Sequence, residues 1–311
     1  MSKLPIPHIS VLYHNIIESL RPKSPGRYVD ATVGAGGHAW GILDASSPDG
    51  QLLGFDLDPQ ALELANQRLD AFSGRYTLQH ASYTSLLLTL QQLGWDRVDG
   101  IVIDLGVSSM QIDSPERGFS FLRDGPLDMR FDPTQLTSAA DLVNTLSEPD
   151  LADIFWRYGE ERLSRRIARA IIANRPFHTT LELANLIQKT VGKSSGKIHP
   201  ATRSFQALRI AVNGELQALE SFLPQAVTAL KPGGRLAVIS FHSLEDRIVK
   251  QFFRKESSDC ICPPDQPVCT CEHKASIIDL TRHPLTAGEE EITGNPRSRS
   301  ARLRVAEKIT E

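Results

Sequence analysis

Residues 27–38 read RYVDATVGAGGH, an apolar run that ends in an acid and leads into a glycine-rich turn. Such a run is typical of a buried strand, and glycines let the turn that follows approach a ligand closely. Working outward from it, short apolar runs alternate with helical stretches over the first hundred residues. We predict strands at 27–32, 51–56, 76–81 and 98–105, and helices from about residue 37, over 59–70 and over 85–93. This βαβαβαβ order with short connections predicts a parallel sheet covered on both faces.

A helical segment then interrupts the alternation. Between about residues 113 and 212 there is no comparable strand, and amphipathic helical patterns occur at 150–158, 160–174 and 181–191. The alternation resumes with a helix at 214–230, a turn at 231–234, a strand at 235–241, a helix at 243–255 and weak strands at 276–280 and 301–306. We therefore predict an α/β domain made of residues 1–112 and 213–311, with an inserted helical domain at 113–212.

Composition and charge narrow the class of protein. The chain has 311 residues, of which 41% are hydrophobic and 23% charged, as in ordinary globular proteins. No apolar run approaches the roughly 20 residues that cross a bilayer, and the first ten residues do not resemble a secretion signal. We expect a cytoplasmic enzyme with no membrane partner.

Charge is distributed unevenly along the chain. Residues 1–150 hold 10 basic and 19 acidic residues, whereas residues 151–311 hold 24 and 18. Such a split suits an acidic pocket beside a surface that faces a polyanion, although basic runs are often only solvated faces. The basic residues cluster as Lys189, Lys193, Lys197, Arg203 and Arg209, and as Arg297, Arg299, Arg302 and Arg304.

Three acids at predicted strand ends select the cofactor. Asp30, Asp56 and Asp104 end the first, second and fourth strands. Asp56 is placed to accept hydrogen bonds from ribose hydroxyls, and the turn lacks the third glycine of a dinucleotide fingerprint. Carboxylates at this edge would repel a pyrophosphate but attract the sulfonium and ammonium of S-adenosylmethionine. We predict S-adenosylmethionine from the three acids together, although for any one acid alone a helix cap or a surface residue is the better interpretation.

Several other side chains keep two interpretations. His38 either caps the helix after the turn or contacts the carboxylate of the methyl donor. Phe119, Phe121 and Phe131 either line the entrance to the predicted pocket or pack in a core, and His242 either contacts the substrate or makes a structural hydrogen bond.

The four cysteines are also ambiguous. They form Cys260-x-Cys262 and Cys269-x-Cys271, a spacing tighter than that of common zinc knuckles. A structural zinc site and four reduced thiols both remain open, and we expect no catalytic metal.

An ordered set of motifs runs through nearly the whole chain. It comprises HISVL at 8–12, DATVGAGGH at 30–38, GFDLDP at 54–59, DLGVSSMQID at 104–113, RGFSF at 117–121, DGPLDMR at 124–130, YGEER at 158–162, HPATRSFQALRIAVNGEL at 199–216, PGGRLAVISFHSLEDRIVK at 232–250 and NPRSRSARLRVAEK at 295–308. Together these resemble the ribosomal small-subunit methyltransferase H (MraW-like) family.

The resemblance implies a class I S-adenosylmethionine-dependent methyltransferase fold, Rossmann-like, with an inserted domain that helps to hold RNA. It implies methylation of the exocyclic 4-amino group of a cytidine in 16S rRNA, cytidine 1402 in the decoding region, with the small ribosomal subunit as partner. Tyr83 stands where the family commonly has Phe, so adenine stacking is expected to survive. The donor contacts that it carries over are Gly36, Gly37, His38, Asp56, Tyr83, Asp104 and Gln111.

The group that orients the target amine is less clear from the sequence. Enzymes that methylate amines in DNA resemble one another in a polar-Pro-Pro-aromatic motif after the fourth strand, whereas residues 104–109 read DLGVSS. We hypothesise that Asp104 or a neighbouring backbone carbonyl holds the amine in line with the donor methyl. Alternatives are a methyltransferase acting on another RNA, a protein or a small molecule, or a non-catalytic ribosome-assembly factor. The oligomeric state is open, and a homodimer is compatible with the sequence.

Overall fold

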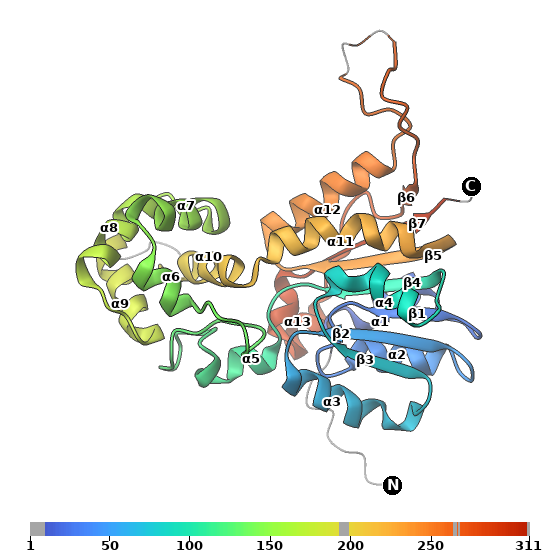
Figure 1. The fold of residues 1–311 in the computed structure, drawn as a ribbon, viewed down its shortest axis with the longest axis horizontal. Helices are drawn as coiled ribbons and strands as arrows, with labels where there is room; N and C mark the ends of the chain where they lie inside the picture. Colours follow the sequence, from blue (N-terminus) through green and yellow to red (C-terminus); the bar gives the residue numbers. More distant parts are fainter. Residues whose placement is uncertain (1–9, 193–198, 264–265, 267, 310–311) are drawn as a thin grey trace. The chain divides into compact units, whose positions relative to one another are not determined.

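A seven-stranded sheet organises the first and last parts of the chain in the computed structural model, which describes residues 10–192, 199–263, 266 and 268–309 (Figure 1). The strand order is β3-β2-β1-β4-β5-β7-β6, with β1 to β5 parallel and β7 antiparallel to both β5 and β6. This confirms the predicted, mostly parallel α/β sheet. The strands are β1 (Arg27–Asp30), β2 (Gln51–Asp56), β3 (Tyr76–His80), β4 (Val98–Asp104), β5 (Leu230–Ser240), β6 (Ile277–Asp279) and β7 (Arg302–Lys308).

Helices cover both faces of the sheet, as predicted (Figure 1). Alternate residues of each strand point to opposite faces, so Ile101 and Ile103 join one core while Val102 joins the other. Each fully buried side chain of this size contributes about 1.5–3 kcal/mol. One face carries α1 (Tyr13–Leu20), α2 (Gly37–Ala45) and α3 (Pro59–Leu69), and the other carries α4 (Leu86–Gln92), α11 (Glu215–Ala229) and α12 (Ser243–Glu256).

Strand β5 is longer than expected. The predicted turn at 231–234 lies within it, because Leu230 already pairs with Val98 before the register shifts and Arg235 pairs with Gly100. The residues of the turn therefore form an irregularity inside the strand. Gly233 has a φ of +75°, a conformation that glycine adopts easily.

The chain divides into two compact units, one of residues 1–106 with 216–311 and one of residues 107–215. The predicted insertion at 113–212 lies within the second unit, whose helices pack around a core of their own. These helices are α5 (Ser109–Asp113), α6 (Ala139–Thr145), α7 (Glu148–Gly159), α8 (Ser164–Asn174), α9 (Thr180–Val191) and α10 (Thr202–Asn213). The remaining short elements are α13 (Glu289–Gly294), η1 (Asp70–Phe72), η2 (Tyr83–Ser85), η3 (Pro115–Arg117) and η4 (Pro296–Ser300).

Within the described residues, no helix combines the length and apolar character that a membrane span requires. His8, Lys193 and Lys197, which the sequence singled out, lie outside the described residues.

Candidate functional site

Three carboxyl groups meet at one edge of the sheet, where the sequence predicted them. β1 ends at Asp30, β2 at Asp56 and β4 at Asp104. Because β1 pairs in parallel with both β2 and β4, the carboxyl ends of the three strands are neighbours. Open α/β sheets bind ligands at such an edge, where the strand order changes direction.

The carboxyl groups of Asp30 and Asp104 are buried, which makes their ionised forms unfavourable. Burial raises the pKa of Asp30 to about 7, although the Thr32 N–H donates to its Oδ1 at 3.2 Å. Burial, with the charges of Asp30 and Glu245, raises the pKa of Asp104 well above its ordinary value. Within the described part of the chain, Asp30 Oδ2 and Asp104 Oδ1 are buried without a hydrogen-bond partner. Buried carboxyls of this kind gain free energy when a cation or a hydrogen-bond donor reaches them.

Asp56 shapes the glycine turn. Its Oδ2 accepts the Gly34 N–H at 2.8 Å and its Oδ1 accepts the Asp58 N–H at 2.9 Å, yet burial still raises its pKa to about 6. The turn then enters α2 through Gly36, whose φ is +78° and where a Cβ would lie 3.2 Å from the Ala65 Cα. The spacing of Asp56 in the sequence does not reveal that it holds the glycine turn. Each oxygen of the Asp56 carboxylate still keeps a lone pair that can accept a ribose hydroxyl.

His38 is buried and does not cap α2, so the capping interpretation is wrong. The N-cap is Gly36, without any side-chain cap bond. The His38 Nε2 lies 3.0 Å from the Val11 carbonyl oxygen, to which it donates, and burial lowers its pKa to about 4. The ring is therefore neutral near pH 7. Gly37 and His38 form the first turn of α2, where backbone N–H groups have no carbonyl partner within the helix.

The two remaining residues that were predicted to contact the methyl donor lie on different units. Tyr83, at the start of η2, packs edge to face on Phe222 with ring centroids 5.0 Å apart. Gln111 belongs to the helical unit, where its Oε1 accepts the Ser108 N–H at 3.0 Å and closes the capping box of α5. The helical unit thus contains Gln111, and the sheet unit contains the other predicted donor contacts, namely Gly36, Gly37, His38, Asp56, Tyr83 and Asp104.

Comparison with known proteins assigns the chain to a family. The sequence matches the MraW methylase family over residues 5–309. The chain belongs to the MraW methylase family. It is an S-adenosylmethionine-dependent methyltransferase of the predicted class I fold, and the resemblance stated from its motifs is confirmed.

Relatives of this MraW-family methylase are similar over nearly their whole length. Ribosomal RNA small subunit methyltransferase H from Dehalococcoides mccartyi is 55% identical over 305 residues, 98% of this chain and 87% of the relative. The enzyme of the same name from Geobacter sp. (strain M21) is 52% identical over 307 residues, 97% of this chain and 98% of the relative. Among solved structures, a putative rRNA methylase from Clostridium thermocellum is a remote match, with 14% identity, a TM-score of 0.44 and 95% of each chain covered.

Part of the predicted basic surface of this MraW-family methylase is structural. The Arg304 guanidinium is 3% exposed and lies 2.7 Å from an Asp246 oxygen, and Arg302 lies 3.1 Å from the other oxygen of that carboxylate. Arg209 pairs with Glu215 at 2.8 Å. The prediction that Arg209 and Arg304 face a polyanion is therefore wrong, because each is withdrawn from solvent beside a buried acid, whereas Arg302 remains exposed.

Other basic residues of the helical unit are exposed. Lys189 and Arg203 remain on the surface, as predicted. The sequence analysis missed the exposed Arg165, Arg166 and Arg169 on α8, whose opposite face buries Ile167 and Ile171. The signal that could have found them is the helical spacing of arginines between apolar residues.

The other ambiguous side chains have packing roles. Phe119 stacks on Phe131 with centroids 5.6 Å apart, and Phe121 lies edge to face with Phe205 at 4.7 Å. These contacts support the core interpretation. His242 Nδ1 accepts the Glu245 N–H at 3.4 Å and forms the N-cap of α12, which supports a structural hydrogen bond.

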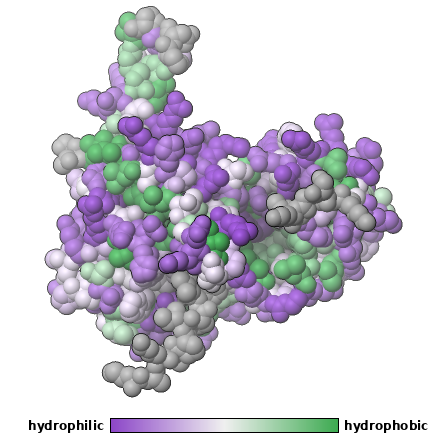
Figure 2. Space-filling view, turned by 180° about the vertical axis from the view of Figure 1, so that it is seen from behind, coloured by the Kyte–Doolittle hydropathy of each residue, from purple (hydrophilic) through white to green (hydrophobic). Residues whose placement is uncertain are grey.

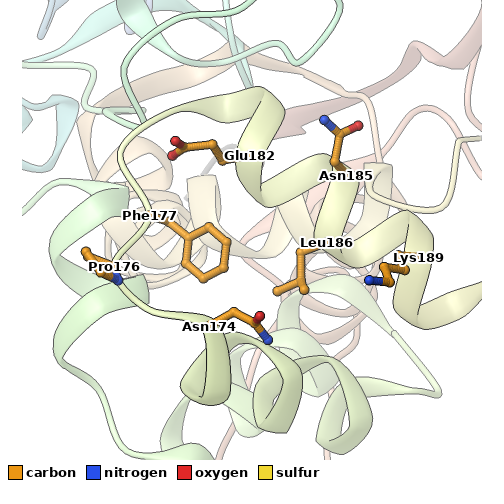
Figure 3. A pocket seen from close by; sticks show the side chains of 7 residues that line it. All are labelled: Asn174, Pro176, Phe177, Glu182, Asn185, Leu186 and Lys189. Atoms are coloured by element: carbon orange, nitrogen blue, oxygen red, sulfur yellow. The ribbon is translucent and has the colours of Figure 1, made fainter.

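An open hollow of about 390 Å³ also lies in the helical unit, between the end of α8 and α9 (Figure 3). Its lining mixes amide, apolar and oppositely charged side chains, and includes none of the predicted donor contacts. The lining residues are Asn174, Pro176, Phe177, Glu182, Asn185, Leu186 and Lys189.

Proposed function

We propose that this methyltransferase acts in the cytoplasm on 16S rRNA of the small ribosomal subunit. It transfers a methyl group to the exocyclic 4-amino group of one cytidine, cytidine 1402 by family resemblance. The names of its relatives, which specify ribosomal RNA of the small subunit, support the substrate class. The single structural observation that carries the proposal is the pair of buried, unpartnered carboxyl oxygens of Asp30 and Asp104 at the sheet edge.

The residues at that edge fit the methyl donor. Its ammonium and sulfonium are the cationic partners that the buried carboxyls of Asp30 and Asp104 lack. The N–H groups of Gly37 and His38, at the positive end of α2, suit its carboxylate. Asp56 suits the ribose hydroxyls. Tyr83 stacks on the adenine, as the resemblance implies, and Gln111 stays a predicted contact of the donor.

Asp104 is the proposed orienting group for the amine. The donor supplies an electrophilic methyl carbon, onto which the lone pair of the cytosine amine moves as the carbon–sulfur bond breaks. The lone pair of the amine must be held in line with the breaking bond, and the nitrogen must pyramidalise and lose a proton, which requires an acceptor beside its N–H bonds. A buried carboxyl whose pKa lies well above its ordinary value holds a proton more readily than an exposed one, which makes Asp104 suited to this task.

The helical unit is the proposed RNA-binding domain. The exposed Arg165, Arg166 and Arg169 of α8, with Lys189 and Arg203, form its described basic surface. Arginine binds phosphate through a planar fork of donors, and such contacts make binding sensitive to salt. The target base must leave its stack to be methylated, which costs least in an irregular or single-stranded segment.

Labelled methyl transfer tests the proposal directly. The protein is incubated with methyl-labelled S-adenosylmethionine and small ribosomal subunits that lack this modification, and the RNA is digested to nucleosides for mass spectrometry. We expect label in N(4)-methylated cytidine. Label in another nucleoside or in ribosomal protein would overturn the proposed acceptor, and intact donor binding without any transfer would overturn small subunits as the substrate.

A further inference from the structure

The segment between α12 and β6 projects as a narrow loop from the sheet unit and carries all four cysteines of the chain (Figure 1). The donor site described above uses none of them. Cys260 and Cys269 are exposed, and Cys262 and Cys271 are partly exposed. The loop therefore holds four thiols together outside any hydrophobic core.

The four sulfur atoms have the spacing of a metal tetrahedron. All four Sγ atoms lie within 4.8 Å of one another, with Cys269 and Cys271 at 3.6 Å and Cys271 and Cys260 at 3.9 Å. A tetrahedron with zinc–sulfur bonds of about 2.3 Å has sulfur–sulfur edges of about 3.8 Å. We propose that Cys260, Cys262, Cys269 and Cys271 bind one zinc ion.

Burial does not explain why the sulfurs converge. The apolar side chains beside them are exposed, Ile261 by 44% and Val268 by 68%, and hydrophobic residues are visible on the projecting loop (Figure 2). Apolar groups that remain in water contribute little to holding the loop closed. A metal supplies the missing free energy, because its bonds to four thiolates form only when the loop is closed.

Backbone groups already point at the sulfurs. The Ile261 N–H donates to Cys271 Sγ and the Cys262 N–H donates to Cys260 Sγ, both at 3.4 Å. Hydrogen bonds of this kind orient metal ligands and stabilise their negative charge. At the base of the loop, His273 Nδ1 lies 2.8 Å from the Ser258 carbonyl oxygen, which ties the two chain segments together.

The chemistry of the four thiolate ligands selects the metal. Four soft thiolates in a tetrahedron favour zinc over magnesium or calcium, which prefer oxygen ligands. Four thiols lose their protons on binding, and the resulting complex carries a net charge of −2. All four coordination positions are filled by protein, so the ion has no open position for a substrate and its role is to hold the loop.

Metal analysis of the full-length protein tests the site. We expect about one zinc per chain after purification without chelator. After removal of zinc, addition of cobalt should produce the visible bands of tetrahedral cobalt bound to thiolates. Cys262→Ser and Cys269→Ser should lose both signals, whereas Val268→Ala, a change in the same loop without a sulfur, should keep them.

Three further outcomes decide against the proposal. Wild-type protein with four freely titratable thiols, no zinc and no cobalt spectrum would show a simple thiol cluster. Protein without zinc and without free thiols would instead show two disulfides. Binding of S-adenosylmethionine by the cysteine variants shows whether they are folded, because the sheet edge lies outside the loop. A cysteine variant that binds donor normally and retains zinc would also overturn the site.

Discussion

Replacing Asp30 by Asn should change how the stability of the donor-free protein depends on pH. Burial raises the pKa of Asp30 from 3.8 to about 7, so the folded chain keeps a proton that the unfolded chain loses above about pH 4. The contribution of this group to stability is complete below pH 3.8 and is lost as pH rises through 7. Asn cannot ionise, and its Oδ1 can still accept the Thr32 N–H.

The magnitude follows from the two pKa values of Asp30. At about 1.4 kcal/mol per pKa unit, the difference between 3.8 and about 7 corresponds to about 4 kcal/mol. Between pH 5 and pH 8, where a folded protein is convenient to study, the wild type should lose about 3 kcal/mol more than Asp30→Asn. The charge of Asp30 also raises the pKa of Asp104, so Asp30→Asn removes part of that shift as well and widens the difference between the two proteins at high pH.

Urea unfolding at several pH values measures this difference, with Asp70→Asn as a control because Asp70 is exposed. We expect Asp70→Asn to parallel the wild type and Asp30→Asn to diverge from it as pH rises. Calorimetry with S-adenosylmethionine should in turn show about tenfold weaker binding by Asp30→Asn at pH 7, where the donor's ammonium is still charged. Parallel pH curves for wild type and Asp30→Asn would refute the assignment of Asp30 as a buried, strained carboxyl.

Three other substitutions test the remaining steps. Asp104→Asn should lower methyl transfer at saturating donor by about a hundredfold or more, because the amide cannot take the amine's proton; unchanged turnover at every donor concentration would remove Asp104 from the mechanism. Gly74→Ala should cost about 1–2 kcal/mol in urea unfolding because of its positive φ. Gly36→Ala should cost more, because its Cβ would also lie 3.2 Å from the Ala65 Cα, and it alone should weaken binding of S-adenosylmethionine. Arg165→Ala should reduce the salt dependence of RNA binding by about one phosphate contact, measured as the slope of affinity against salt concentration, whereas Arg282→Ala should leave that slope unchanged, because Arg282 is an exposed arginine of the sheet unit.

The sheet edge could be predicted because its signals are local. Asp30, Asp56 and Asp104 each follow an apolar run, and the parallel order of the strands brings their ends together whatever the details of packing. The glycine turn is equally local, because positive φ at Gly34 and Gly36 is a property of those residues. For the same reason the family motifs already specified the reaction class and the cofactor.

Partners distant in sequence could not be predicted, since no local pattern encodes them. Arg302 and Arg304 look like a basic tail, but the fold places them beside Asp246, 56 and 58 residues away. His38 has the spacing of a helix cap, yet its ring turns to the Val11 carbonyl.

By itself, then, the sequence determined the order of strands and helices, the glycine turn, the position of the acids and the family of the enzyme. Only the tertiary structure decided which of these charged groups are buried and which have partners. It brought the four cysteine sulfurs within 4.8 Å of one another, and among the described residues it left Asp30 Oδ2 and Asp104 Oδ1 without a hydrogen-bond partner. The physical reason is that desolvation and pairing depend on all the chain segments that meet at a point, whereas propensity and periodicity depend on one segment alone.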